Sequence, residues 1–412
     1  MIASTKAAET KAVSTASAHA DRFDELDQLL VAQAHFWQIR PFHSRELVWR
    51  HSHPDLCTAL LELTADDVAQ LESNTTALAH WLRPWLGNDG ERLLALERLV
   101  PLPQRSLAVP LRFDTGIPGR KWQQVQALAA VLPAEQQPVL EWCAGKGYLG
   151  RLLAQVDGRD VVSLEWQETL CRAGQSAADE ASLPVRFVQA DALADSSVGW
   201  LPTNGQVVAL HACGDLHTTL MRHWVASDSQ RLTLSPCCYH LIGSDGYLPL
   251  SKRAAASRLR LAKLDLQLPL REVVTGGRGA GRKRHIEVLW RLAFDEWQRE
   301  ERGCDQYLPL PAFPKSFLAG SFADFVVWAA QTKGLAPPSS LNEAHWLQCG
   351  QARLSLVRRM ELVSHLFRRP LEVWLLLDRA LYLAEHGARV RIGTFCDWSV
   401  TPRNLVIDAQ RA

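Results

Sequence analysis

Residues 138–150 constrain the fold more than any other stretch, because they combine an apolar strand, a glycine-rich turn and the start of a helix. The stretch reads Pro-Val-Leu-Glu-Trp-Cys-Ala-Gly-Lys-Gly-Tyr-Leu-Gly. Gly145 and Gly147 permit a tight turn and a close approach of the backbone to a ligand. Glu141, at the end of the strand, can order that turn. The pattern predicts the first βα unit of a parallel sheet with a ligand site at its edge.

Short apolar stretches recur after this unit and are separated by helical sequence. The predicted strands are residues 138–141, 161–165, 185–189, 206–210 and 231–234. Their alternation with helices indicates βαβ units, whose ligands bind at the carboxyl ends of the strands. Residues 390–395 and 404–408 predict a final strand pair. We therefore expect an α/β, Rossmann-like sheet that is completed by the extreme C-terminal segment.

The remaining sequence is mostly helical, and 412 residues suffice for two or three domains. The expected parts are a disordered tail at 1–20, an N-terminal helical region at 21–120, a sheet domain at 121–245 plus 389–412, and a mostly helical basic insertion at 246–388. Within the N-terminal region, residues 35–53 interleave basic and aromatic side chains. That pattern is typical of surfaces for unstacked bases, and equally of a helical packing face.

Acidic residues end three successive predicted strands, at Glu141, Glu165 and Asp191. An acid in the position of Glu165 accepts the hydroxyls of a ribose, and Asp191 is placed to receive an adenine amino group. A dinucleotide-dependent oxidoreductase is the competing interpretation, because the glycines also fit Gly-x-Gly-x-x-Gly. The third acid favours S-adenosylmethionine (SAM). The expected cofactor contacts are Glu141, Cys143, Gly145, Lys146, Gly147, Glu165, Asp191 and His211.

The fourth and fifth predicted strands end in clusters of polar and sulfur side chains. The fourth ends in His-Ala-Cys-Gly-Asp-Leu-His over 211–217, and the fifth in Ser-Pro-Cys-Cys-Tyr-His over 235–240. Both clusters should face the methyl group of the cofactor across one crevice, and packing alone does not need such groups there. The candidate catalytic residues are Asp215, Cys238, His240, His211, Cys213 and Cys237.

These motifs resemble a family of SAM-dependent methyltransferases with a Gly-Lys-Gly loop, His-x-Cys-Gly-x-Leu and Cys-Cys-x-His. The family includes methyltransferase-like proteins and the glutathione-transferase C-terminal-domain-containing protein, and it is similar to the tRNA acceptor-stem ribose 2′-O-methyltransferase. Thr401-Pro-Arg-Asn404 matches the Ser-Pro-Arg-Asn ending common in that family. The resemblance covers about 120–245 and 390–412. It implies a class I methyltransferase sheet and SAM as cofactor, whereas the N-terminal region and the insertion lie outside it, so it does not carry the substrate over.

Several chemistries remain open at the predicted crevice. The Asn/Asp-Pro-Pro-Tyr/Phe motif of amino-methylating enzymes is absent, which disfavours N-methylation of adenine. Methylation of a ribose 2′-hydroxyl needs a base, and Asp215, His211, His217 or His240 could serve. Methylation of cytosine C5 would use cysteines at the two strand ends. We expect no metal, although zinc held by cysteines and histidines of these clusters is an alternative, as are buried inert thiols.

Residues 251–291 are strongly basic, with eleven Lys/Arg and only three Asp/Glu. This excess of positive charge indicates which class of molecule accepts the methyl group. Arg278, Arg282, Lys283 and Arg284 fall in a glycine-rich stretch that predicts a mobile basic loop beside the active site, suited to a polyanion. We therefore expect RNA as the partner, either tRNA or rRNA. A protein or small-molecule acceptor, and a catalytically degenerate SAM-fold protein that only binds RNA or a partner, are the alternatives.

Two further features bear on where the chain works. It contains no run of about 18 apolar residues, so no membrane partner is expected. Its nine cysteines are irregularly spaced, which is typical of free thiols in a reducing cytoplasm and not of a secreted disulfide framework. The expected localisation is cytoplasmic.

Overall fold

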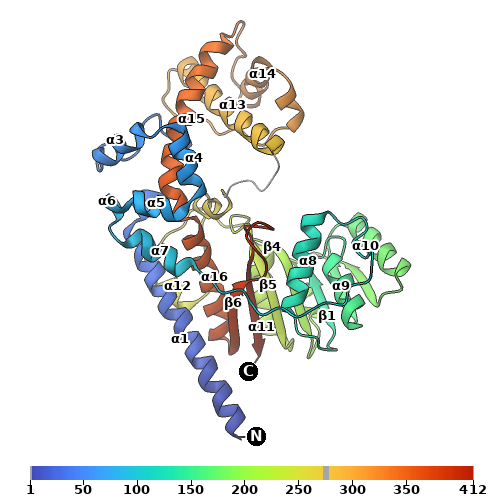
Figure 1. Ribbon diagram of the computed structural model, residues 1–412. Coiled ribbons are helices and arrows are strands. Elements are labelled where there is room, and N and C mark those ends of the chain that lie inside the picture. The colour runs from blue at the N-terminus through green and yellow to red at the C-terminus, as the bar shows by residue number, and fades with distance from the viewer. Residues whose placement is uncertain (1, 272–277, 412) are drawn as a thin grey trace. The chain divides into compact units, whose positions relative to one another are not determined.

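The computed structural model describes residues 2–271 and 278–411, and the chain divides into two compact units (Figure 1). The sheet unit comprises Met1–Val31, Ala95–Glu272 and Arg368–Ala412. The helical unit comprises Ala32–Leu94 and Val273–Phe367. Each unit is therefore assembled from segments that lie far apart in the sequence.

The sheet unit is built on one seven-stranded sheet with the order β3-β2-β1-β4-β5-β7-β6. Strands β1 to β5 are parallel, whereas β7 is antiparallel to both β5 and β6. The strands are β1 (Val139–Trp142), β2 (Val161–Glu165), β3 (Val185–Gln189), β4 (Gln206–Cys213), β5 (Arg231–Cys237), β6 (Ala388–Thr394) and β7 (Leu405–Arg411). The expected Rossmann-like α/β sheet, with its C-terminal strand pair, is confirmed.

Helices pack on the sheet through apolar side chains. The helices of this unit are α1 (Ile2–Ala32), α8 (Gly119–Val131), α9 (Tyr148–Asp157), α10 (Glu168–Glu180), α11 (Asp215–Ala226), α12 (Lys252–Ala256) and α16 (Arg368–Glu385), with short 3-10 turns at Asp195–Trp200 and Asp265–Leu270. Helix α9 packs against β1 and β2, and α8 packs against α9. Leu128 of α8 and Leu149, Leu152 and Leu153 of α9 are almost fully buried in their shared core. This packing fixes the turn between β1 and α9.

The N-terminal segment differs from the expectation, because α1 extends over Ile2–Ala32 where a disordered tail was predicted at 1–20. The segment is rich in alanine, the residue with the highest helix propensity, which accounts for the helix. Its C-terminal part buries Phe23 and Leu26. The rings of Phe23 and Trp374 on α16 have centroids 5.1 Å apart, so this helix belongs to the packing of the sheet unit.

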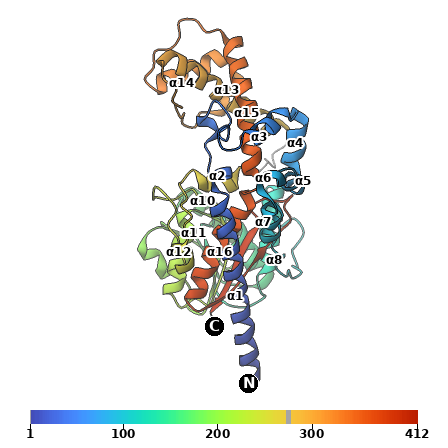
Figure 2. The ribbon, with the colours of Figure 1, turned by 90° about the vertical axis from the view of Figure 1, so that its left-hand side faces the viewer.

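The helical unit combines parts of two regions that were predicted separately (Figure 2). It contains α2 (Ala34–Trp37), α3 (Pro54–Glu62), α4 (Ala65–Ser73), α5 (Thr75–Trp81), α6 (Arg83–Leu86), most of α7 (Asp89–Glu97), α13 (Arg278–Arg302), α14 (Phe322–Thr332) and α15 (Glu343–His365), with 3-10 turns at Pro41–His43 and Lys315–Ala319. The predicted insertion at 246–388 is therefore divided, since residues 246–271 and α16 belong to the sheet unit.

The aromatic residues of 35–53 act mainly in packing. Phe36, Trp37 and Trp49 are 1%, 3% and 2% exposed, so their rings are unavailable to stack on bases. Among the described residues, no helix is long and apolar enough to span a membrane.

Candidate active site

The turn after β1 has the geometry predicted for a ligand-binding loop. Cys143, Gly145 and Gly147 all have left-handed backbone, with φ of 55°, 60° and 66°. A Cβ on Gly147 would lie 2.4 Å from Cζ of Phe187, so only glycine fits there. Lys146 is exposed at the tip of the turn. The turn therefore presents backbone groups and the Lys146 side chain at the carboxyl edge of the sheet.

Glu141 lies beneath this turn. Its Oε2 accepts a hydrogen bond from Ser163 Oγ at 2.9 Å, and the nearby backbone N–H groups of Leu149 and Gly150 favour its charged form. A Cβ on Gly150 would come within 2.5 Å of Glu141 Oε2, which explains the third glycine of the motif. Burial raises the pKa of Glu141 to about 7. Glu141 therefore lies between the end of β1 and the first turn of α9, and its role in ordering the loop stays a prediction.

The second and third acids lie side by side at the ends of β2 and β3. Glu165 Oε2 accepts from Gly145 N at 2.9 Å, and Glu165 Oε1 accepts from Gln167 N at 3.1 Å. Ala190 N donates to the backbone oxygen of Glu165 at 3.0 Å, which brings Asp191 next to Glu165. Asp191 is exposed. Two carboxylates therefore flank the glycine-rich turn.

Sequence reasoning missed two side chains beside these acids. Trp166 follows Glu165 and is 68% exposed, and Leu193 lies two residues past Asp191 and is 50% exposed. Large apolar side chains left in solvent next to polar groups often mark a binding surface. The signal was in the sequence, since each predicted strand-end acid is followed within two residues by a large apolar residue.

His211 lies in a bulge of β4, where the register with β5 shifts and φ of His211 is 62°. Its Nε2 is 2.8 Å from Oε1 of Gln124 on α8, whereas its Nδ1 is buried and has no partner among the described residues. Burial, together with Lys121 and Arg403, lowers the pKa of His211 to about 4. The imidazole is therefore neutral near pH 7, and its Nδ1 lone pair is free to accept a hydrogen bond.

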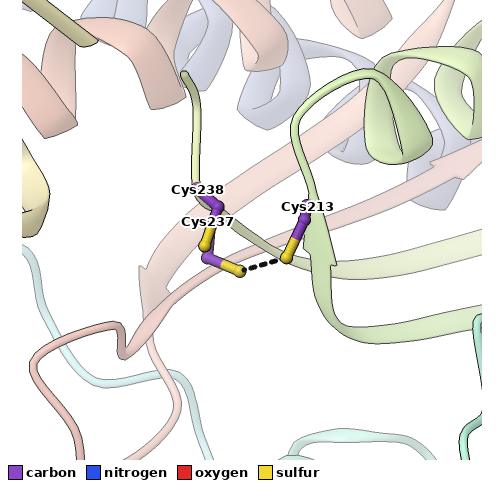
Figure 3. A group of neighbouring side chains, drawn as sticks. All are labelled: Cys213, Cys237 and Cys238. Carbon is purple, nitrogen blue, oxygen red and sulfur yellow. Dashed lines mark hydrogen bonds between the residues drawn. The ribbon is translucent and has the colours of Figure 1, made fainter. Parts of the chain in front are cut away.

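Cys213, Cys237 and Cys238 form a thiol cluster at the ends of β4 and β5 (Figure 3). Their three sulfurs lie within 4.8 Å of one another, and Sγ of Cys213 is 3.5 Å from Sγ of Cys237. Hydrogen bonding within the cluster lowers the pKa of Cys238, against the effect of burial, and nearby Arg403 and His240 lower it further. Interactions with Cys213 and Cys238, together with burial, raise the pKa of Cys237.

The other polar residues of the two motifs have distinct surroundings. Asp215 begins α11, is partly exposed, and accepts from Gly243 N at 2.7 Å through its Oδ2. His240 is partly buried, and its Nδ1 has no partner among the described residues. His217 is fully buried with both ring nitrogens engaged, by the backbone oxygen of Ala212 at 3.1 Å and by Nε of Arg379 at 2.8 Å. The alternative use of His217 as a base or zinc ligand is therefore wrong.

Two cations that sequence reasoning missed lie at this edge. Lys121 on α8 and Arg403 before β7 both act electrostatically on His211, and Arg403 also acts on Cys213 and Cys238. Within the part of the chain that the structure describes, neither has an acidic partner within 4.0 Å. Asn404 holds the segment of Arg403 by donating to the backbone oxygen of Cys396 at 2.8 Å.

The predicted basic loop is instead the start of a helix. Residues 278–284 form the first turns of α13 in the helical unit, whereas residues 276–277 and the side chain of Arg278 lie outside the described residues. The side chains of Arg282, Lys283 and Arg284 are exposed. The four glycines of 276–281 suggested a turn, but the apolar face formed by Trp290 and Phe294 packs the helix into the core of its unit.

Comparisons with known proteins match residues 120–245 to the family model of a methyltransferase domain. The tRNA (uracil-54, C5)-methyltransferase of Pyrococcus abyssi, in complex with S-adenosyl-L-homocysteine, is 17% identical over 28% of this chain and 29% of that chain, with a TM-score of 0.24. TrmN from Thermus thermophilus is 20% identical over 33% of this chain and 46% of that chain, with a TM-score of 0.26. An rRNA methylase from Streptococcus thermophilus is 14% identical over 29% and 71%, with a TM-score of 0.23. The chain thus spans less than half the length of the first two proteins.

Proposed function

We propose that this SAM-dependent methyltransferase transfers the methyl group of its cofactor to RNA, either tRNA or rRNA. The main support for RNA as the methyl acceptor comes from the start of α13, where Arg282, Lys283 and Arg284 are consecutive and exposed. No acid of the described chain pairs with them, and the first turn of the helix contains none. Three adjacent positive charges repel one another, and a bound polyanion would relieve that repulsion.

The strand ends supply a cofactor site that suits SAM. Glu165 would accept hydrogen bonds from the ribose hydroxyls, and Asp191 from the adenine amino group. Trp166 and Leu193 would cover the faces of the adenine ring, since both are apolar and exposed beside these acids. The remaining predicted contacts are the turn residues Cys143, Gly145, Lys146 and Gly147, with Glu141 holding the turn from below and His211 at the end of β4.

The acceptor would bind over β4 and β5, because the first three strand ends hold the adenosine half of SAM. Two chemistries fit the groups present there. Asp215, His211 or His240 could take the proton of a ribose 2′-hydroxyl. Cys238 could attack a cytosine ring before transfer to C5, with Cys213 and Cys237 stabilising its thiolate. The free Nδ1 atoms of His211 and His240 support the first route, and the lowered pKa of Cys238 supports the second.

Labelled SAM tests the acceptor class directly. The purified protein is incubated with labelled SAM and either total RNA or total protein, and label in RNA is the expected result. Label in protein or in small molecules would contradict the proposal. SAM binding without transfer would indicate a degenerate enzyme that only binds RNA or a partner.

A variant tests the basic surface. Replacing Arg282, Lys283 and Arg284 by Ala should weaken RNA binding and reduce the slope of log affinity against log salt by about 2–3, because fewer counterions are released. The control replaces Arg98, Arg222 and Arg389, which are exposed in the sheet unit, by Ala. If the slope of log affinity against log salt is unchanged in the α13 variant, a protein or small-molecule acceptor is favoured over RNA.

A further inference from the structure

We infer that Cys213, Cys237 and Cys238 bind one zinc ion through their three sulfurs, with the fourth position left to a nitrogen or oxygen donor. The sequence predicted no metal here, and the thiols were candidate catalytic groups. The inference concerns this cluster alone and does not depend on which molecule accepts the methyl group.

The geometry of the cluster is close to that of a zinc site. In a tetrahedral site with Zn–S distances of about 2.3 Å, the sulfurs lie about 3.8 Å apart. The sulfurs of the cluster lie within 4.8 Å, and those of Cys213 and Cys237 are 3.5 Å apart. Cys213 and Cys237 are register partners on adjacent strands, so the backbone already holds two of the ligands together. Binding would need side-chain movements of only about 1 Å.

Packing alone does not explain why three thiols converge. A single buried cysteine serves as a small apolar residue, and any similar side chain could fill the same space. Cys238, however, has a left-handed backbone with φ of 48°, a conformation that is strained for a non-glycine residue. That conformation keeps the sulfur of Cys238 beside the other two (Figure 3). A bound metal would account for the strain as well as for the convergence.

Charge supports the same assignment. Three thiolates and Zn²⁺ together carry a net charge of −1. Arg403, which acts electrostatically on Cys213 and Cys238, has no acidic partner among the described residues and would neutralise that charge. His240, two residues past Cys238, has a buried Nδ1 without a partner in the described chain and is a nitrogen donor on the same segment. Thiolates select soft metals, and zinc is the one that prefers tetrahedral sulfur and nitrogen ligands.

The assignment also bears on the chemistry. A thiolate bound to zinc shares its negative charge with the metal and is a weaker nucleophile, so the assignment disfavours attack of Cys238 on a cytosine ring. The cluster would instead join the ends of β4 and β5, and the ribose 2′-hydroxyl route would remain for the methyl transfer. Metal binding and methyl transfer are measured separately, so failure of one proposal does not imply failure of the other.

Metal analysis of the full-length protein tests the inference. The protein, reduced and loaded with zinc in the absence of oxygen and then freed of loose metal, should retain about one zinc per chain by mass spectrometry. Cys213→Ser and Cys238→Ser should lose most of it. Cys171→Ser is the control, because Cys171 is a buried thiol of the same unit that lies outside the cluster and donates to the backbone oxygen of Glu165.

X-ray absorption spectroscopy of zinc in the wild-type protein identifies the metal ligands directly. This measurement does not depend on whether the variants fold. Three sulfur ligands at about 2.3 Å from zinc are the expected result. Zinc retained with fewer than three sulfur neighbours would overturn the assignment, as would zinc content of the wild type no higher than that of Cys213→Ser. Loss of zinc from the Cys171→Ser control in a folded protein would also overturn it.

Discussion

Nε of Arg379 on α16 donates a hydrogen bond of 2.8 Å to Nε2 of His217, and these two buried side chains are only 1% and 0% exposed. The bond fixes the tautomer of His217, whose Nδ1–H then donates to the backbone oxygen of Ala212 at 3.1 Å. Burial and the charge of Arg379 lower the pKa of His217 well below its usual value. Helix α16 thereby supports the turn from β4 into α11, which carries part of the candidate site.

Arg379→Met should destabilise the sheet unit. Arg379 also donates to the hydroxyl of Tyr247 at 3.0 Å and to the backbone oxygen of Leu375 at 2.7 Å, so the variant leaves several buried acceptors unsatisfied. The expected loss is about 2–4 kcal/mol of unfolding free energy, measured by urea denaturation. Arg222→Met, at an exposed position on α11, is the control and should change little. Equal stabilities of the two variants would refute the supporting role of Arg379.

Glu165→Ala should weaken SAM binding. The variant removes the acceptor expected for the ribose hydroxyls and also the group that holds the N–H groups of Gly145 and Gln167. We expect a loss of about 2–3 kcal/mol, or roughly 30- to 150-fold in Kd, measured by calorimetry. Glu168→Ala, in the exposed first turn of α10, is the control. Unchanged affinity in a folded Glu165→Ala protein would contradict the cofactor assignment.

Glu141 should make stability depend on pH. Its pKa is raised from 4.5 to about 7 in the folded protein, so the unfolded chain releases this proton first as the pH rises. The stabilisation of the folded state by the protonated Glu141 carboxyl is present in full below pH 4.5 and is lost as the pH rises through about 7. It corresponds to at most about 3 kcal/mol. Glu141→Gln should remove the dependence and stabilise the protein at pH 8, by chemical denaturation across this range.

His211 also makes the unfolding free energy depend on pH, and its effect has the opposite sign to that of Glu141. Its pKa is lowered from 6.5 to about 4, so its contribution is present above pH 6.5 and is lost as the pH falls toward 4. The quantity to compare is therefore the difference between wild type and Glu141→Gln at each pH. A difference that stays constant from pH 4.5 to 8 would show that the Glu141 carboxyl is not perturbed.

The sheet and the positions of the three acids at its strand ends could be predicted because their signals are local. Each predicted strand is a short apolar stretch followed by a turn, and Glu165 ends one such stretch while Asp191 lies two residues past another. Apolar sequence at the C-terminal end likewise predicted the pairing of β6 with β7, which the structure confirms. Local pattern therefore sufficed to place the three acids at one edge.

Contacts between distant segments could not be predicted in the same way. Arg379 lies 162 residues beyond His217, and no local pattern relates the two. Lys121 precedes the first strand and reaches the site only because α8 packs on α9. The start of α13 was predicted as a loop from its glycines, whereas the tertiary packing of residues further along that helix decides its structure.

The product of the reaction and the behaviour of Asp215 together identify the acceptor atom. With the thiol cluster holding zinc, the expected product is a 2′-O-methylated nucleotide, whose 3′ phosphodiester resists alkali because the neighbouring hydroxyl is blocked. Asp215→Asn retains an oxygen that can accept from Gly243 N but cannot take a proton, so it should lower kcat by about 10²- to 10⁴-fold without changing SAM affinity. Asp228→Asn, exposed just after α11, is the control. Methylated cytosine C5 in digested RNA, with full activity of Asp215→Asn, would contradict the 2′-hydroxyl route and show that the enzyme acts on the base.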